Sequence, residues 1–386
     1  MLISQSIIST GELKPSIYHV KNEGTVICEV SPSGSTTGSK EAKTIKLVDK
    51  GFAKFLSKHT FPCEQTFFDN KIKVYGSDFS VPASLVNLRL LSDGELYNYI
   101  CKTYSADKAI NMPKIILNLI NGGKHTGGST TMCEFMIIPN GSSIADSLTI
   151  ATRVWSRLGV LLSSKKQDIF VSGREGGYVT KNLTDLQVIF LIDTAINLEN
   201  VDCSIAIDIA ANNFSKKING KFVYYDNNRK YCTTERVQYY KDLVRKFPRI
   251  KYLEDAFNEA DMDGWTELMN FFKDTSVLIV ADDLTVTNKD YILKYKECFN
   301  AVILKVNQVG TFTGLVDAFK SADNCVTIMS QRSGETDSST IVDCGVGLGV
   351  NMMKLGAPAR ERIVKYNRLL RIEEGLKWKK SKRVLS

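Results

Sequence analysis

A lysine inside an apolar stretch is the first candidate for chemistry in this chain of 386 residues. The stretch from Phe299 to Gly310 is rich in aliphatic and β-branched residues and ends in glycine, which predicts a buried β-strand. Alternation along that strand places Ile303, Lys305 and Asn307 on one face. Because burying an ammonium group is costly, Lys305 is catalytic, paired with an acid, or able to reach water from an edge strand.

Three carboxylates occupy similar positions, since Asp208, Glu254 and Asp282 each end a short apolar run. If these runs are strands of one sheet, the three acids converge on one place and repel one another. Mg²⁺ would relieve that repulsion, because it prefers oxygen ligands, needs few carboxylates and keeps open positions for a substrate. The alternative is that each acid pairs with a nearby lysine or arginine.

Further residues would complete an acid–base site. A lysine beside a metal ion and the cationic Lys354 can have a lowered pKa, so Lys305 could remove a proton next to a carboxylate. The guanidinium of Arg332, with Ser333 beside it, suits a phosphate group. Glu175 lies in a glycine-rich segment and could donate a proton opposite the lysine, as loss of a hydroxyl group requires.

The elements that would position these residues recur along the second part of the chain. From Asp208 onward, most apolar runs follow one another after about two dozen residues, enough for a strand and its return helix. Their number favours a closed α/β barrel over an open sheet, with the site at the carboxyl ends of the strands. The expected strands are 115–120, 135–138, 169–171, 204–208, 252–254, 277–282, 302–305, 326–330 and 352–354.

The first part of the chain, residues 1–108, has the mixed pattern of a smaller α+β domain that caps the barrel of residues 109–386. Val26–Val30 is an expected strand, and 43–57 and 84–104 have helical spacing of apolar residues. The small polar residues of 31–38 predict a mobile loop, which matters if the site needs a lid.

Composition narrows the class of protein. No apolar run approaches the roughly 20 residues of a membrane span, and the first ten residues lack the features of a signal peptide. The nine cysteines form no paired motif, which favours reduced thiols and a cytoplasmic location. No nucleic-acid-binding motif is recognised, so no nucleic-acid partner is expected. The net charge of +8 is partly due to the basic tail, residues 377–383, which is either solvated or a contact for an acidic protein partner.

Seven segments in order resemble the enolase family, whose members are phosphopyruvate hydratases. Sites of the enolase type in general use a lysine or histidine base with one or two Mg²⁺ ions. The resemblance covers nearly all of the barrel and is weaker in a shortened first domain. The segments are 119–125, 134–137, 175–177, 282–288, 304–308, 332–336 and 366–374.

The resemblance implies the fold and most of the chemistry. The family has a small α+β domain and an eight-fold barrel with an irregular start, is usually dimeric, and acts in glycolysis. By position, Lys305 matches the base that takes the C2 proton of 2-phosphoglycerate, and Glu175, with Glu134 beside it, matches the acid at the C3 hydroxyl. The matching ligands of the first Mg²⁺ are Asp208, Glu254 and Asp282.

The same resemblance assigns the substrate contacts. Lys354 matches a lysine that neutralises the substrate carboxylate, and Arg332 and Ser333 match phosphate contacts. His125 matches the histidine of a loop that closes on the substrate. Thr36 falls on the lid loop that completes a second Mg²⁺ site.

Several supporting positions depart from the family pattern. Gln331 stands where a histidine is usual; it can hydrogen-bond in the substrate pocket but cannot titrate. Arg174 replaces an acid next to Glu175 and would lower the pKa of that carboxyl if it points toward it. Cys133 replaces a glutamine, and Asn213 replaces an acid.

Three functions follow as alternatives. The intact metal and proton-transfer groups favour an enolase-type lyase, of full or reduced activity. The altered supports and the basic tail would instead suit a non-catalytic enolase-like scaffold or binding protein. A barrel that takes an α-proton from another carboxylate is the third, and the retained Arg332, Ser333 and Lys354 argue against it.

Overall fold

The computed structural model describes residues 2–7, 16–22, 25–31, 62–105, 109–123, 129–167, 173, 175–226 and 229–385. Several sequence predictions lie outside these residues. They are the loop residue Thr36, His125, Arg174, the expected helix 43–57 and the expected strand 169–171.

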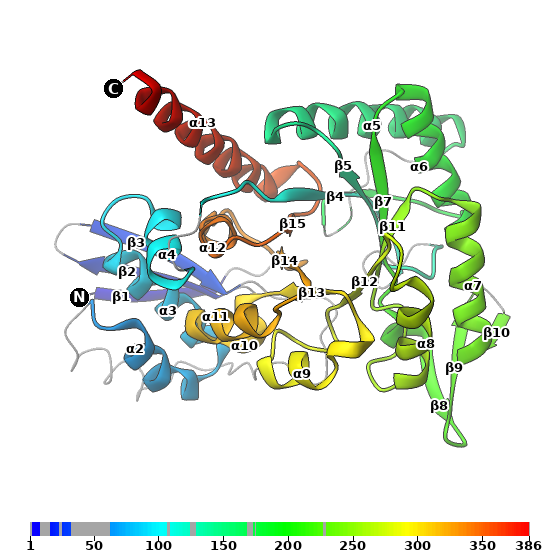
Figure 1. Cartoon of the computed structure of the whole chain (residues 1–386), viewed down its shortest axis with the longest axis horizontal. Coiled ribbons are helices and arrows are strands. Elements are labelled where there is room, and N and C mark those ends of the chain that lie inside the picture. The colour runs from blue at the N-terminus through cyan, green and yellow to red at the C-terminus, as the bar shows by residue number, and fades with distance from the viewer. Residues whose placement is uncertain are drawn as a thin grey trace.

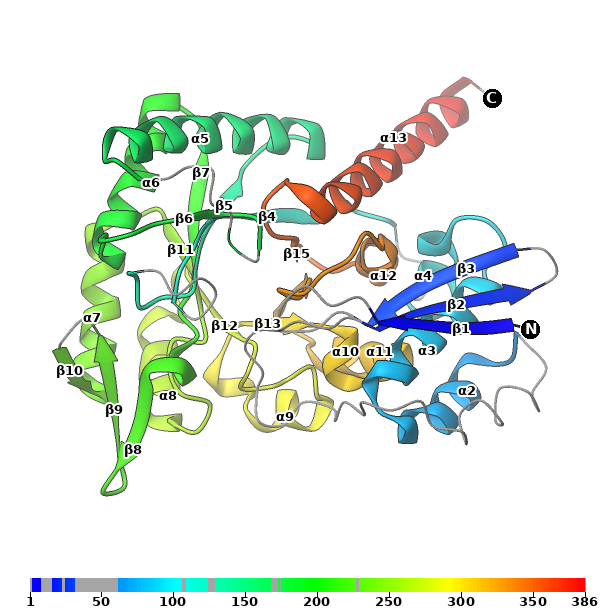
Figure 2. The ribbon, with the colours of Figure 1, turned by 180° about the vertical axis from the view of Figure 1, so that it is seen from behind.

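Among its described residues, the first part of the chain has a three-stranded antiparallel sheet and three α-helices (Figures 1 and 2). The sheet has the order β1 (Leu2–Ile7), β2 (Ser16–Asn22), β3 (Thr25–Ser31), and β3 is the predicted strand 26–30. The helices are α2 (Gln65–Ile72), α3 (Ser77–Leu91) and α4 (Leu96–Tyr104). The predicted helical segment 84–104 is therefore two helices, because Gly94 between them has a φ of +94°.

Eight strands close into a barrel, as predicted. In order around it they are β4 (Lys114–Asn121), β5 (Glu134–Pro139), β7 (Cys203–Asp208), β11 (Ile250–Glu254), β12 (Leu278–Ala281), β13 (Ala301–Leu304), β14 (Val326–Ser330) and β15 (Met352–Lys354). The barrel closes through parallel pairing of β15 with β4. Its start is irregular, because β5 is antiparallel to both β4 and β7, whereas the later neighbours are parallel. A short strand, β6 (Tyr178–Val179), also pairs with β4.

Helices surround the barrel and follow its strands (Figure 1). They are α5 (Ile144–Ser164), α6 (Asp185–Glu199), α7 (Thr233–Lys246), α8 (Met262–Phe272), α9 (Lys289–Lys294), α10 (Val306–Val309), α11 (Phe312–Ser321), α12 (Thr340–Leu348) and α13 (Ile363–Leu385). Between β7 and α7 the chain forms a small antiparallel sheet of β8 (Ser215–Ile218), β9 (Lys221–Asp226) and β10 (Arg229–Cys232). Among the described residues, no helix is both long and apolar enough to cross a membrane.

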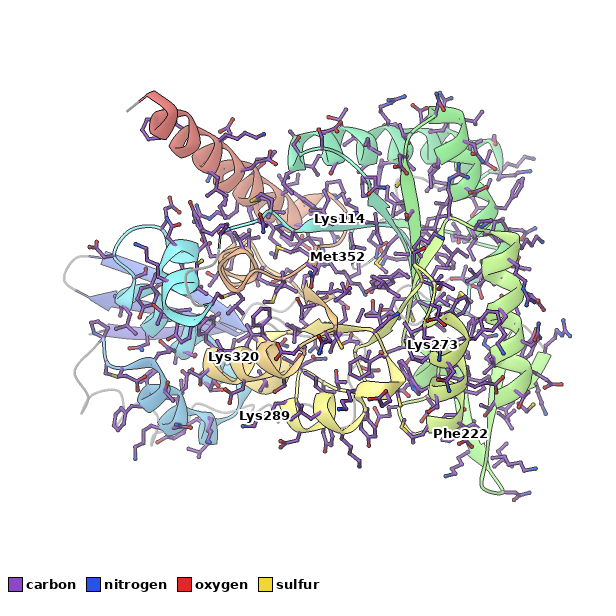
Figure 3. All side chains as sticks on the ribbon, viewed as in Figure 1. Lys114, Phe222, Lys273, Lys289, Lys320 and Met352 are labelled. Carbon is purple, nitrogen blue, oxygen red and sulfur yellow. The ribbon has the colours of Figure 1, made fainter. Side chains whose placement is uncertain are left out.

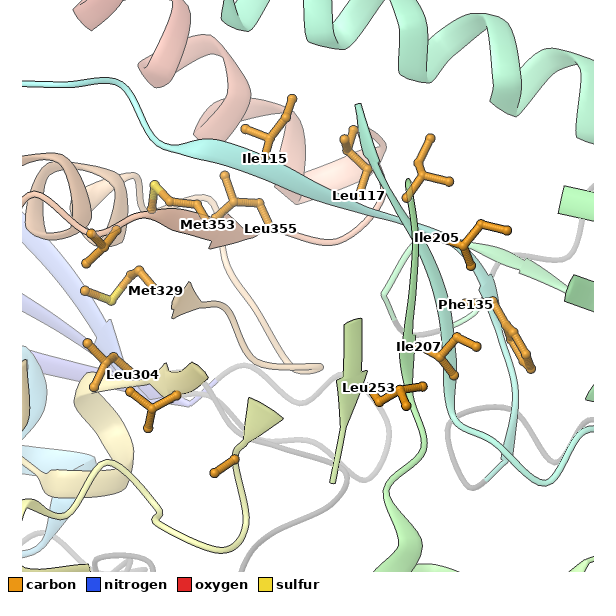
Figure 4. Close-up of a cluster of buried hydrophobic side chains, with 14 of the residues drawn as sticks. Ile115, Leu117, Phe135, Ile205, Ile207, Leu253, Leu304, Met329, Met353 and Leu355 are labelled. Atoms are coloured by element: carbon orange, nitrogen blue, oxygen red, sulfur yellow. The ribbon is translucent and has the colours of Figure 1, made fainter. Parts of the chain in front are cut away.

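Alternation along the strands divides the barrel core in two. Side chains such as Ile116, Met136, Ile303 and Ile328 fill the interior. Their strand neighbours point outward and pack against the helices, where Figure 4 shows Ile115, Leu117, Met329 and Met353 among others. The cysteines whose side chains are described are all free thiols, as expected from their spacing.

The first part of the chain contacts the barrel near β13 and β14. Helix α4 packs against α12, and α3 packs against α10 and α11. Hydrogen bonds tie the two parts together: the backbone N–H of Phe312 donates to Ser84 Oγ (2.9 Å), and Thr313 N–H donates to Asp69 (2.9 Å). The Arg89 guanidinium donates to Thr340 Oγ1 at 3.0 Å.

Candidate active site

The charged residues predicted for catalysis converge at one end of the barrel. Asp208, Glu254 and Lys354 are the last residues of β7, β11 and β15, and Asp282 directly follows β12. Glu134 is the first residue of β5, and the antiparallel direction of β5 brings it opposite Asp208. All five side chains are buried. The carboxyl ends of the parallel strands therefore form a buried, charged mouth.

Lys354 occupies the centre of three carboxylates. Its Nζ lies 3.0 Å from Asp208 Oδ2, 2.9 Å from Glu254 Oε2 and 3.4 Å from Glu134 Oε2. Each of these acids comes from a different strand. The lysine thus balances part of the negative charge in the mouth, which is the pairing that the sequence left open as the alternative to a metal.

The charge balance is incomplete, as the pKa values indicate. Burial raises the pKa of Glu134 and of Glu254 above their ordinary values, and neighbouring carboxylates add to this. The lysine opposes the shift without cancelling it. Burial by itself would lower the pKa of Lys354, but Asp208, Glu134 and Glu254 outweigh it and hold that pKa well above the usual range. Additional positive charge at the mouth of the barrel would therefore stabilise the ionised form of these buried carboxyl groups.

Lys305 is at the end of its strand rather than inside it. The predicted strand 299–310 stops at Leu304, and residues 306–309 form helix α10, so Asn307 does not share a strand face with Lys305. The Lys305 ammonium donates to Asp282 Oδ2, and its side chain is 11% exposed. An edge-strand lysine reaching into solvent is therefore excluded for this structure.

The pairing with Asp282 raises the pKa of Lys305, whereas a lowered pKa was predicted for this lysine beside a metal ion. Burial would lower that pKa, but the charge of Asp282 outweighs burial and raises it. Burial likewise would raise the pKa of Asp282, and the charge and hydrogen bond of Lys305 hold it below its ordinary value. Arg332 and Lys354 act in the opposite direction on Lys305, so the pKa would fall if Asp282 were engaged elsewhere.

Two residues that sequence reasoning did not assign hold this pair in place. Gln308 Nε2 donates to Asp282 Oδ1 at 3.0 Å, and Thr287 Oγ1 donates to Gln308 Oε1 at 2.6 Å. The Thr287 hydroxyl also accepts the backbone N–H of Lys305 at 2.9 Å. Thr287 has a φ of +54°, an uncommon conformation for a β-branched residue. Gln308 and Thr287 lie in segments of the sequence that resemble the enolase family. That resemblance is the sequence signal that could have identified them as site residues.

Glu175 lies in the loop before β6 and lines the mouth of the barrel near Glu134. Two further side chains, Gln331 and Arg362, position its carboxyl group. Gln331, just after β14, donates from Nε2 to Glu175 Oε2, and Arg362 Nη2 lies 4.0 Å from the same oxygen. Arg362 is fully buried and also donates to the Ser333 carbonyl at 3.0 Å. Gly356 permits this packing, because a Cβ there would lie 2.4 Å from Gln331 Nε2. Gln331 is thus a positioning partner of the proposed acid.

The predicted substrate contacts that lie within the described residues, Gln331, Arg332, Ser333 and Lys354, line the same small pocket. It encloses about 20 Å³, room for one water molecule, so a larger ligand requires side chains to move. The lining residues are Glu134, Glu175, Asp208, Asp282, Lys305, Ser330, Gln331, Arg332, Ser333 and Lys354.

Two substituted positions contact one another at the edge of this site. Asn213 Nδ2 donates to Cys133 Sγ at 3.5 Å, and the backbone N–H of Cys133 donates to the Asp208 carbonyl at 3.0 Å. The amide and the thiol, both uncharged, thus replace a more polar pair next to Asp208. Asn118 supports Glu134 directly, donating to Oε2 at 3.0 Å.

A second acidic group adjoins the predicted metal ligands. Oxygens of Asp255, Asp282 and Asp283 lie within 4.8 Å of one another, and this group shares only Asp282 with the predicted trio. Both oxygens of Asp255 already accept backbone N–H groups, from Asp282 at 3.0 Å and Asp283 at 2.9 Å. Asp255 therefore shapes the loop that presents Asp282, and we retain Asp208, Glu254 and Asp282 as the predicted ligands.

The residues present fit a hard divalent cation. Asp208 Oδ1 is buried and has no hydrogen-bond donor among the described residues. A buried carboxylate oxygen without a partner is unfavourable, and a cation satisfies it. Carboxylate oxygens from separate strands are the donors that Mg²⁺ prefers.

Comparison with protein families agrees with this architecture. The sequence model of the family 'enolase, C-terminal TIM barrel domain' matches residues 109–382. The match spans all eight barrel strands and most of α13. It includes every described residue to which a catalytic, substrate-binding or metal-binding role was assigned.

Proposed function

The chain belongs to the family of the enolase C-terminal TIM barrel domain, and on that premise we propose that it is an Mg²⁺-dependent lyase of the enolase type. The reaction is the interconversion of 2-phosphoglycerate and phosphoenolpyruvate in glycolysis. The observation that carries the proposal is the convergence of Lys305, Lys354 and the acids Asp208, Glu254 and Asp282 at one barrel mouth.

Lys305 is the proposed base. Only the unprotonated amine can take a proton from the carbon next to the substrate carboxylate, so the ammonium must first lose its proton. Engagement of Asp282 by a cation would remove the interaction that raises the Lys305 pKa, and burial with Arg332 and Lys354 would then lower it. The pairing with Asp282 is thus compatible with a base that is activated on ligand binding.

Glu175 and Lys354 have complementary roles in the proposal. Glu175, with Glu134 close by, delivers a proton to the departing hydroxyl group, and Gln331 orients its carboxyl. Lys354 and Arg332 supply positive charge for the substrate carboxylate and phosphate.

Mg²⁺ bound by Asp208, Glu254 and Asp282 would supply electrostatic stabilisation of the negative charge that develops on the substrate carboxylate. A second Mg²⁺ completed by Thr36, and closure of the loop with His125, remain part of the proposal.

The non-catalytic scaffold is the second candidate. The contacts that favour it are the lysine–carboxylate pairs, which fill the mouth with protein charges, and Gln331 in contact with Glu175. On this alternative a protein partner binds elsewhere, for example at the basic tail, and the barrel serves as a support. A homodimer and a cytoplasmic location are further proposals, the former testable by analytical ultracentrifugation.

An ultraviolet assay of phosphoenolpyruvate formation tests the two candidates. Purified protein is given 2-phosphoglycerate with saturating Mg²⁺, and the assay is repeated after chelation. Mg²⁺-dependent turnover that is lost in the Lys305→Ala variant supports the lyase. Absence of turnover in the wild-type protein, with Mg²⁺ binding intact, supports the scaffold.

A further inference from the structure

The small sheet β8–β10 presents one face to the body of the protein. On that face Tyr224 is buried and its ring contacts Phe214 (6.3 Å between centroids) and Phe257 (5.7 Å). Asp226 is also buried and forms an ion pair with Arg236 of α7 at 2.6 Å. Figures 1 and 2 show the β8–β9 hairpin projecting beyond α7 and α8.

Register and alternation define the opposite face. Lys216 pairs with Val223, Ile218 with Lys221, Lys230 with Tyr225 and Cys232 with Val223, and each such pair points to the same side. These residues alternate with Tyr224 and Asp226, so they point away from the body. We call them the lysine face: Lys216, Ile218, Lys221, Val223, Tyr225, Lys230 and Cys232.

The lysine face combines positive charge with exposed apolar surface. Its three lysines are exposed, Ile218 is 45% exposed, and the face carries no acidic residue. The one carboxylate in these three strands, Asp226, points inward and is neutralised by Arg236. Tyr225 lies half-buried between two of the lysines, with Lys216 Nζ 5.9 Å and Lys230 Nζ 5.7 Å from its ring centroid.

We propose that the lysine face is a binding surface for single-stranded nucleic acid, a function separate from the barrel site. On binding, the exposed lysines would turn from the Tyr225 ring to neutralise successive phosphates, and a base would take the place of an ammonium group over that ring. A positively charged surface with aromatic rings is how sequence-tolerant proteins hold single strands, and β-sheet platforms offer the rings for stacking.

Charge complementarity would also admit an acidic polypeptide, but such a partner leaves the central aromatic ring without a role. The sequence contains no recognised nucleic-acid motif. The basic residues of the lysine face are not contiguous but spread over residues 216–230. The antiparallel register brings them together on one face. The expectation of no nucleic-acid partner, which rested on motifs, is therefore replaced by this proposal.

Fluorescence anisotropy with a labelled oligouridylate of about a dozen nucleotides tests the proposal on the full chain. At physiological salt we expect a dissociation constant of about 10⁻⁶ to 10⁻⁴ M, the order of non-specific binding, and tighter binding at lower salt. Three phosphate contacts predict a log–log salt slope of about −2, since single strands give about −0.7 per phosphate. The Tyr225→Ala variant should bind at least about five-fold more weakly with an unchanged slope, and Tyr225→Phe should bind like the wild type.

The lysine triple variant Lys216→Gln, Lys221→Gln, Lys230→Gln should lose binding. Its control is Lys320→Gln, which removes a positive charge on α11, far from the hairpin residue Phe222 in Figure 3. Circular dichroism checks that each variant is folded. Absence of oligonucleotide binding, or equal loss with Lys320→Gln, would overturn the proposal. So would polyglutamate binding as tightly as the oligonucleotide with no effect of Tyr225→Ala, because that result would identify an acidic polypeptide surface.

Discussion

Lys354 Nζ lies 3.0 Å from Asp208 Oδ2, and this contact joins two strands, β15 and β7, that are separated in the barrel by β4 and β5. The same ammonium contacts Glu254 on β11. One lysine thus holds together acids from across the mouth. A cation at Asp208 and Glu254 would compete with Lys354, so the stability and the metal affinity of this site are coupled.

Replacing Lys354 by methionine should destabilise the protein strongly. The change preserves much of the side-chain volume but leaves Asp208, Glu254 and Glu134 without their shared cation. Removing one partner of a buried ion pair typically costs about 3–5 kcal/mol. Urea unfolding measures this, and added Mg²⁺ should restore more stability to Lys354→Met than to the wild type. Equal effects of Mg²⁺ on both would mean that metal and lysine do not share these carboxylates.

Lys305→Ala should remove the proposed lyase turnover while Mg²⁺ binding is retained. No other amine lies in contact with Asp282 among the described residues, and loss of a general base typically costs about 10²–10⁴-fold. Steady-state rates measure the effect, with calorimetry of Mg²⁺ as the check on the site. Full turnover in Lys305→Ala would show that Lys305 is not the base.

Gln331→His should increase turnover. Gln331 donates to Glu175 but cannot exchange a proton, whereas an imidazole can do both near neutral pH. The rate of the variant should therefore gain a pH dependence between about pH 6 and 7. Gln331→Met, which removes the donor, is the matched control and should be slower than the wild type. If all three proteins turn over equally, the contact between Gln331 and Glu175 has no catalytic role.

Asp185 should make stability fall as pH rises toward neutrality. It is buried at the start of α6, where Oδ1 accepts the N–H groups of Thr131 and Met132 and Oδ2 has no partner among the described residues. Burial, with the charge of Asp226, raises its pKa to about 7. A folded-state pKa above the unfolded value means that the folded state holds its proton more tightly, so stability is lost between about pH 4 and 7 and is level above.

Asp185→Asn removes that titration and keeps an acceptor for the two N–H groups. The difference in unfolding free energy between variant and wild type should increase from about pH 4 to pH 7, reaching a few kcal/mol at most. Urea unfolding across this range measures it, and Asp274→Asn, at an exposed position, should show no such trend. A pH-independent difference would contradict the assigned pKa.

The barrel could be predicted from sequence because polar residues end its apolar runs. Asp208, Glu254 and Lys354 each terminate a strand in the structure, as the pattern indicated. The predicted strand through Lys305 is too long, since the apolar spacing continues into α10 and short apolar runs fit a strand or a helix. The antiparallel direction of β5 was not predicted, because strand spacing does not encode direction and the family resemblance implied only an irregular start of the barrel.

The contacts within the site were less predictable. Gln331 and Glu175 are far apart in sequence, and their hydrogen bond depends on how β14 and the loop before β6 meet in three dimensions. Thr287 positions both Lys305 and Gln308. Its left-handed backbone conformation is unusual for a threonine, and no sequence pattern predicts it. The direction of the Lys305 pKa depended on its pairing with Asp282, which residue types alone did not determine.

Mg²⁺ calorimetry in the presence of a phosphonate mimic of 2-phosphoglycerate, combined with the ultraviolet assay on the same sample, tests the central claim most directly. The lyase proposal predicts that Mg²⁺ binds, that the mimic tightens its binding, and that phosphoenolpyruvate forms. Binding without turnover would contradict catalysis and favour the scaffold. Absence of both would mean that the acids at the mouth of the barrel serve only to hold Lys305 and Lys354.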